Sequence, residues 1–124
     1  MQHVVIGLLY NNTNAILIAL RPPHVAEPGI WEFPGGKVEL NETLENALIR
    51  EYREEIGIEI TRSEFLFSID TAHSLTLHVF QIHDYDGIPY GRENQTIRFV
   101  PTNTLKNYVF PKANATIVAY LLQS

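Results

Sequence analysis

Seven glutamates gather in one short part of this sequence, and carboxylates at such a density can bind a metal ion or move a proton. They make up half of the fourteen acidic residues of the chain. Mg²⁺ takes oxygen ligands of this kind and usually keeps waters that a phosphate can replace. The seven are Glu39, Glu42, Glu45, Glu51, Glu54, Glu55 and Glu59.

The element expected to carry the central acids is a helix from about Thr43 to Ile56, followed by a glycine in the position favoured for a C-cap. At roughly 100° per residue its apolar side chains share one broad arc, while Asn46, Arg50 and Arg53 face away from it. Glu51 and Glu55 fall inside the apolar arc, and Glu54 lies at its edge. The apolar side chains are those of Leu44, Ala47, Leu48 and Tyr52.

Carboxylates converging on one helix face repel each other unless a cation lies among them. A nearby lysine or arginine would serve, but a divalent hard cation is the stronger candidate. The alternative is a solvated acidic helix face with Arg50 and Arg53 as local partners. The preceding pair Gly35-Gly36 also has a simpler explanation, a tight turn that needs positive φ.

The remaining elements place this helix within a mixed α+β chain. Buried strands are expected at His3 to Tyr10 and Ala15 to Leu20, which form a hairpin, and an exposed proline-containing loop from Arg21 to Gly29. One short extended segment precedes the helix, further ones follow it, and an amphipathic helix ends the chain. The later segments are Lys37 to Leu40, Ile58 to Ile60, Glu64 to Thr71, Ser74 to His83, a loop from Asp84 to Gln95, Thr96 to Val100, and the helix from Lys112 to Leu122.

Glycines and acids together form a longer pattern. From Gly36 the chain runs through five residues to Glu42, then seven more to REYREEIGI at residues 50–58. This 23-residue stretch resembles the Nudix hydrolase signature at every fixed position, with Tyr52 where the family usually has an aliphatic residue. The resemblance implies an α+β Nudix fold, in which a mixed β-sheet is sandwiched between helices (an α/β/α sandwich).

The resemblance also implies an active site that depends on Mg²⁺, with Mn²⁺ as the alternative. On that analogy the metal ligands are Glu51, Glu54, Glu55 and the Gly35 carbonyl, and Glu51 is the first candidate for the general base. The reaction implied is hydrolysis of a nucleoside diphosphate linked to another group. Metals that bridge phosphate oxygens would absorb charge developing on the leaving group.

Beyond the signature, the chain is similar to the MutT-like branch of the family, which hydrolyses oxidised purine nucleoside triphosphates. The similarity rests on WEFPGGK at residues 31–37, GIPYGRE at 87–93 and FPKAN at 110–114. It implies that Glu93 is a further metal ligand or water-orienting group. It also implies substrate binding by Arg21, Phe33, Lys37, His73 and Asn114.

Asn114 has a physical argument of its own, because a side-chain amide matches a purine edge that carries a carbonyl and a ring N–H. The alternative role for Asn114 is capping of the last helix. The function expected is conversion of 8-oxo-dGTP to 8-oxo-dGMP and pyrophosphate. Another nucleoside diphosphate derivative, such as a pyrimidine triphosphate or a nucleotide sugar, and a nucleotide sensor without catalysis are the alternatives.

Length and composition agree with a single domain over residues 1–124. The net charge of −5 disfavours binding to long nucleic acids. No apolar run approaches the roughly 20 residues of a membrane span, so neither a signal peptide nor a membrane anchor is expected. The absence of cysteine excludes disulfides, thiolate metal sites and cysteine nucleophiles. We expect a cytoplasmic monomer whose partner is a small-molecule nucleotide.

Overall fold

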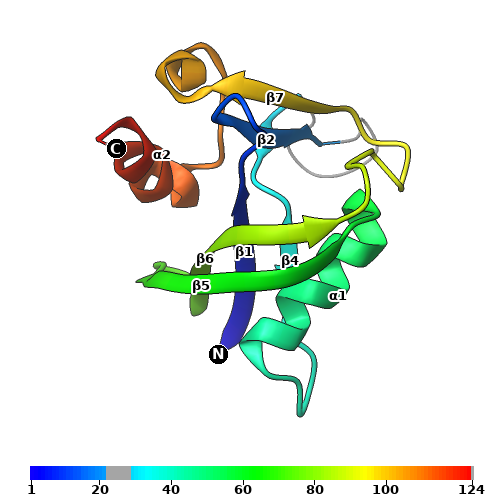
Figure 1. The fold of residues 1–124 in the computed structure, drawn as a ribbon. Coiled ribbons are helices and arrows are strands. Elements are labelled where there is room, and N and C mark those ends of the chain that lie inside the picture. Colours follow the sequence, from blue (N-terminus) through cyan, green and yellow to red (C-terminus); the bar gives the residue numbers. More distant parts are fainter. Residues whose placement is uncertain (22–28, 124) are drawn as a thin grey trace.

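The computed structural model describes residues 1–21 and 29–123, so most of the loop expected between Arg21 and Gly29 lies outside the described residues. Two short 3₁₀ turns, Thr102–Asn107 and Lys112–Asn114, accompany the main elements. In chain order these are β1 (Gln2–Leu9), β2 (Ala15–Leu20), β3 (Trp31–Glu32), β4 (Gly35–Lys37), α1 (Leu44–Ile56), β5 (Glu59–Asp70), β6 (Leu75–Asp86), β7 (Ile97–Pro101) and α2 (Ala115–Leu122), as Figure 1 shows.

The strands form two sheets. One has the order β4-β1-β6-β5, with β1 parallel to β6 and the other pairs antiparallel; the second is antiparallel, in the order β3-β2-β7. The expected β1–β2 hairpin is therefore wrong beyond the turn, where a single bridge joins Tyr10 to Ile16. Both edges of β1 are already used by β4 and β6, so β2 has no edge of β1 left to pair with.

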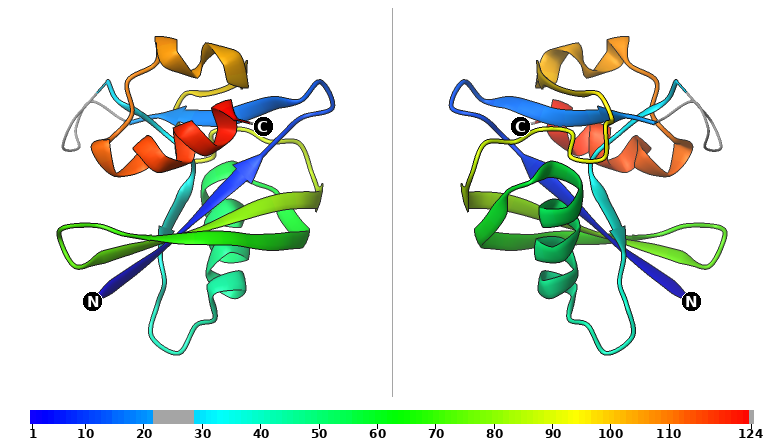
Figure 2. Two further views of the ribbon diagram at one scale, coloured as in Figure 1. Left: turned by 90° about the vertical axis from the view of Figure 1, so that its left-hand side faces the viewer. Right: turned by 90° about the vertical axis from the view of Figure 1, so that its right-hand side faces the viewer.

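The two helices cover opposite faces of the four-stranded sheet (Figures 1 and 2). The alternation of side chains along β1 creates this arrangement, because Val5 and Leu9 belong to the core packed under α1, whereas Ile6 and Leu8 belong to the core packed under α2. A mixed sheet between helices confirms the α+β sandwich. The second sheet, which contributes to both cores through β2, was not predicted.

Several element boundaries differ from those expected. One long strand, β5, replaces the two segments proposed on either side of residues 61–63, and it accommodates them through register shifts against β6. The last helix starts later than expected, because Lys112–Asn114 is a 3₁₀ turn in which the Asn114 N–H donates to the Pro111 carbonyl. In residues 1–21 and 29–123, no helix is long and apolar enough to cross a membrane.

Candidate active site

Helix α1 presents the acids, and its own ends are well defined. Thr43 caps the N-terminus by accepting a hydrogen bond from the Asn46 N–H at 3.1 Å, and Gly57 ends the helix in the left-handed conformation at φ 73°. The face that packs on β1 buries Ala47, Leu48, Tyr52 and Ile56. Packing of this face sets the rotation of α1, and the carboxylates are carried at the border of the buried surface.

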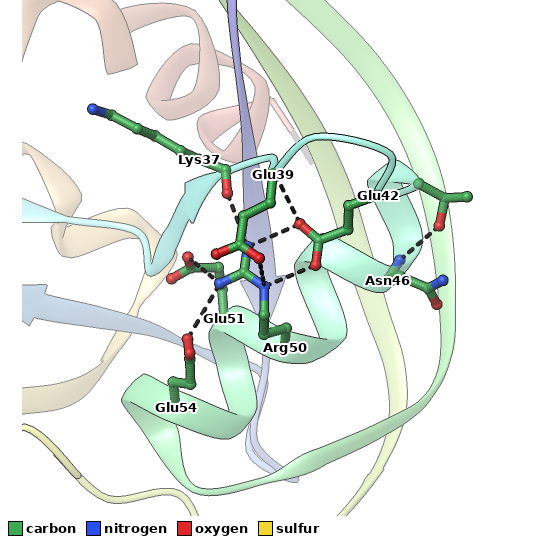
Figure 3. A network of polar contacts seen from close by, with 8 residues as sticks. Lys37, Glu39, Glu42, Asn46, Arg50, Glu51 and Glu54 are labelled. Carbon is green, nitrogen blue, oxygen red and sulfur yellow. Dashed lines mark hydrogen bonds and ion pairs between the residues drawn. The ribbon is translucent and has the colours of Figure 1, made fainter.

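Arg50 lies inside the acidic cluster, which corrects the expectation that it faces away (Figure 3). Its guanidinium donates to Glu42 at 2.8 Å and 2.9 Å, to Glu51 at 2.9 Å and to Glu54 at 3.2 Å. A further bond reaches the Lys37 carbonyl at 2.9 Å. Helical angles describe the positions of Cα atoms only. The long side chain of Arg50 extends from α1 toward the residues that precede the helix, so it bonds carboxylates both there and on α1 itself.

Hydrogen bonding within the Arg50 network shifts the pKa values of two of its members, Glu42 and Arg50. Hydrogen bonds from Arg50, followed by one from the Glu39 N–H, lower the pKa of Glu42 to about 2. Hydrogen bonding to Glu42 is likewise the main reason that the pKa of Arg50 lies above its ordinary value. Glu42, a fixed position of the signature, therefore serves here as an anchor for Arg50.

Glu55 lies on the other side of Glu51 and has a different environment. Burial, followed by a hydrogen bond with Glu51 and the charges of Glu51, Glu93 and Glu32, raises the pKa of Glu55 to about 10. Three other carboxyl groups thus act on Glu55, as expected of a site that binds a cation. These carboxyl oxygens suit a divalent hard cation, which would provide a positively charged neighbour for Glu55.

The described residues do not hold a preformed metal geometry: within residues 1–21 and 29–123, no group of three histidine, aspartate or glutamate side chains converges closely enough. Arg50 is the cation that Glu51 and Glu54 share instead. Binding of a metal ion by Glu51, Glu54 and Glu55 therefore requires rotation of at least one of these flexible side chains.

The positions of Gly35 and Gly36 leave no room for a Cβ atom. They belong to β4, where they pair with Ile6 and Val5 of β1, and neither adopts positive φ. A Cβ on Gly35 would overlap the Val5 carbonyl oxygen, and a Cβ on Gly36 would overlap the Glu51 carboxylate. The simpler explanation of a turn with positive φ is thus wrong, and the pair instead allows close approach of β1, β4 and α1.

Tyr52 links α1 to β1 and to Pro34, the residue that precedes β4. Its buried hydroxyl lies 2.9 Å from both the Gly7 carbonyl and the Pro34 carbonyl, so its proton is shared between them. A Cβ on Gly7 would come within 2.6 Å of the Tyr52 hydroxyl, so Gly7 provides the room for it. The departure from the usual aliphatic residue is matched by this glycine in β1.

A cavity of about 250 Å³ opens beside Gly35 and Gly36. Phe33 is buried in its wall and stacks on Phe110 with ring centroids 4.9 Å apart. Asn114, only 7% exposed, also lines the cavity, and its side chain makes no capping bond to α2. The capping alternative for Asn114 is thereby not realised.

Arg21 reaches the same cavity together with an acid that sequence reasoning did not single out. The Arg21 Nε donates to Glu32 at 3.0 Å, and both side chains line the cavity. Burial raises the pKa of Glu32, with Arg21 acting in the opposite direction. The signal available for Glu32 was a charged residue between two aromatic residues, Trp31 and Phe33.

Three further predicted residues lie outside this cavity wall. Lys37 turns its carbonyl toward Arg50 while its exposed side chain extends away from the network (Figure 3). His73 is exposed in the turn between β5 and β6, two residues before Leu75, which does line the cavity. Glu93 is exposed in the loop between β6 and β7, where its charge acts on Glu55.

Comparison with known proteins identifies the family. The model of the NUDIX domain family matches residues 5–120 of this chain. The chain belongs to the Nudix family. The Nudix prediction from the signature is thus confirmed, and hydrolases of this family generally need divalent metal ions.

Individual Nudix relatives cover most of the chain. An 8-oxo-dGTP diphosphatase of Escherichia coli is 31% identical over 121 residues, which is 95% of this chain and 94% of that protein. A CTP pyrophosphohydrolase of the same organism is 38% identical over 96 residues, 75% of this chain and 71% of that protein. A solved MutT structure, from work on Aliivibrio salmonicida and Vibrio cholerae, superposes with a TM-score of 0.91 at 40% identity, covering 98% and 97% of the two chains.

Proposed function

We propose that this Nudix protein hydrolyses oxidised purine nucleoside triphosphates, with 8-oxo-dGTP converted to 8-oxo-dGMP and pyrophosphate. The observation that carries the proposal is the continuity of the site. One cavity is lined by Asn114 and Phe33 and also by Gly35 and Gly36, and Gly36 adjoins the Glu51 carboxylate. A base bound beside Asn114 would extend its phosphates toward the acids of α1.

The cofactor proposed is Mg²⁺, with Mn²⁺ as a substitute. Glu51, Glu54, Glu55 and the Gly35 carbonyl would hold it, and Glu93 would join them from the facing loop. When bound, the cation neutralises phosphate oxygens and the charge that develops on the leaving pyrophosphate. Glu51, which lies against Gly36 and is partly buried, is the residue we assign to orienting and deprotonating the attacking water.

Residues of the cavity wall would select the base. The Asn114 amide would accept from a ring N–H and donate to a carbonyl of the oxidised purine. Phe33, held by stacking on Phe110, provides an apolar wall and keeps water away from the bound base. The Arg21–Glu32 pair, at 3.0 Å, holds the arginine in the cavity wall, where its guanidinium could bind a phosphate or ribose oxygen.

A pyrimidine nucleoside triphosphate is the second candidate substrate. The similarity to a CTP pyrophosphohydrolase favours it, and an asparagine amide is also able to pair with the edge of cytosine. The same acids would act in both reactions. A sensor without catalysis is disfavoured because a binding protein has no evident need for Glu51, Glu54 and Glu55 together.

The cellular setting follows from the proposed substrate. Residues 1–124 would act as one domain, a monomer in the cytoplasm, where the nucleotide pool is found. The net charge of −5 would oppose binding to long nucleic acids, whereas a small nucleotide accompanied by its cation can still approach.

The decisive experiment is a panel of oxidised and normal nucleoside triphosphates and nucleotide sugars, read out by pyrophosphate or phosphate release with Mg²⁺. We expect the highest kcat/KM for 8-oxo-dGTP. Glu54→Gln should lower kcat by about 100-fold without changing the fold. Its control is Glu45→Gln, an exposed glutamate in the first turn of the same helix. If no nucleotide in the panel yields a product, the proposal of an enzyme would be overturned and the alternative of a nucleotide sensor would be favoured.

A further inference from the structure

The loop between β6 and β7 is bonded to the last turn of α1, which it passes in Figure 1. The Tyr90 N–H donates to the Ile56 carbonyl at 3.0 Å, and the Arg92 N–H donates to the Glu55 carbonyl at 2.9 Å. The Arg92 guanidinium reaches the Arg53 carbonyl at 3.0 Å. Carbonyls that a helix leaves unpaired at its C-terminus are thus satisfied by this loop.

The Gln95 side chain completes the attachment and joins two of the acids of the site. Its Nε2 donates to the Glu55 carbonyl at 2.9 Å, and its Oε1 accepts from the Glu93 N–H at 2.9 Å. One planar, partly buried amide therefore connects the main chain of Glu55 to the main chain of Glu93. The two acids are 38 residues apart in sequence, and this bridge, together with the bond from the Arg92 N–H to the Glu55 carbonyl, ties their main chains together.

The loop around this bridge is compact. The Asn94 N–H donates to the Gly91 carbonyl at 3.0 Å, and Asn94 adopts positive φ at 65°. A Cβ on Gly91 would overlap the Gln95 carbonyl oxygen, so the turn closes tightly only with glycine there. This tight turn keeps the Gln95 amide within hydrogen-bonding distance of the Glu93 N–H.

We propose that Gln95 is a positioning residue, which holds Glu93 at the distance from Glu55 at which both carboxylates can serve one cation and its phosphate. The inference rests on the proposed function, because it takes Glu93 as part of the site. Partners of this indirect kind orient ligands without touching the metal themselves.

The test compares Gln95→Met, which keeps the length but removes donor and acceptor, with Gln95→Glu, which keeps only the acceptor. Gln81→Met, a partly buried glutamine of β6 that lines a separate cavity, is the matched control. We expect Gln95→Met to weaken Mn²⁺ binding to the substrate-free protein, followed by electron paramagnetic resonance, and to lower kcat, each by about 10- to 100-fold. Gln95→Glu should show a loss in the same direction, and Gln81→Met should match the wild type.

A double-mutant cycle separates positioning from general stability. In a Glu93→Gln background, Gln95→Met should have little further effect on kcat, because the residue through which it acts is already lost. The inference would be overturned if the effects of Glu93→Gln and Gln95→Met on kcat multiplied. It would also be overturned if both Gln95 variants folded and kept the Mn²⁺ affinity and kcat of the wild type. Neither result would contradict the proposed enzymatic function. A wild-type protein that hydrolyses no nucleotide would instead overturn the proposed function.

Discussion

The Glu51 carboxylate occupies the space in which a side chain on Gly36 would begin. Gly36 belongs to β4 and Glu51 to α1, so this contact sets how closely helix and strand approach. Gly36 also lines the cavity, so the Glu51 carboxylate lies next to a residue of the cavity wall. A glycine is required because of the neighbouring side chain, since its own backbone conformation is open to any residue.

Gly36→Ala should therefore displace the Glu51 carboxylate without unfolding the chain, because the overlapping atoms are the far end of a flexible side chain. We expect kcat to fall by about 10- to 100-fold while the far-ultraviolet circular dichroism stays that of the wild type. Steady-state kinetics on a cleaved nucleotide provide the measurement. Wild-type turnover in this variant would show that the position of Glu51 is unimportant.

The Tyr52 hydroxyl should contribute measurably to stability. Tyr52→Phe leaves two buried carbonyls with one donor fewer and should cost about 1–3 kcal/mol in the free energy of unfolding. Tyr52→Leu, which restores the residue type usual in the family, should cost more, because it adds a cavity opposite Gly7. Urea denaturation measures both. Tyr90→Phe, at a side chain that is 52% exposed, is the control and should change little.

Divalent cations should stabilise the protein before any nucleotide is present. A ligand that binds only the folded state adds about 2.7 kcal/mol at 100 times its Kd, so Mg²⁺ or Mn²⁺ should raise the Tm of metal-stripped protein. Glu55→Gln should diminish this rise, and Glu45→Gln should preserve it. Equal shifts in wild type and Glu55→Gln would remove Glu55 from the ligand set.

Asn114 should decide which base is hydrolysed. Asn114→Ala removes the donor and acceptor, and Asn114→Asp replaces the donor with a second acceptor. Both should lower kcat/KM for 8-oxo-dGTP by about 10-fold or more, the scale of 1–3 kcal/mol for a lost hydrogen bond in a buried site. A generic nucleoside triphosphate should be affected far less. An unchanged preference would contradict base recognition by Asn114.

Stability should fall as the solution is acidified through the titration of His78. Burial, followed by the charge of His3, lowers the pKa of His78 from 6.5, while Asp70 acts in the opposite direction. The unfolded chain then binds more protons than the folded one below about pH 6.5, so the free energy of unfolding rises with pH across that window. His78→Gln, which can still bond to Ser68, should flatten this dependence in urea titrations. An identical slope in both proteins would contradict the prediction.

The sequence alone determined the parts of this protein that depend on local periodicity and on fixed spacing. Local sequence was enough to predict helix α1, its glycine C-cap and its apolar face, because a helix repeats every 3.6 residues and buries one stripe of side chains. The spacing from Gly36 to Ile58 likewise indicated the Nudix family. The apolar run within residues 3–10 was enough to predict a buried strand there.

Tertiary structure decided what depends on residues far apart in the chain. Only the fold shows that β1 pairs with β4 and β6 and leaves β2 to a second sheet, since strand partners compete for edges. Only side-chain packing shows that Arg50 turns into the acidic cluster, and that Glu32 joins Arg21 in the cavity wall. Gln95 joins Glu55 to Glu93 across the loop for the same reason: a hydrogen bond is set by distance in space, which sequence separation does not specify.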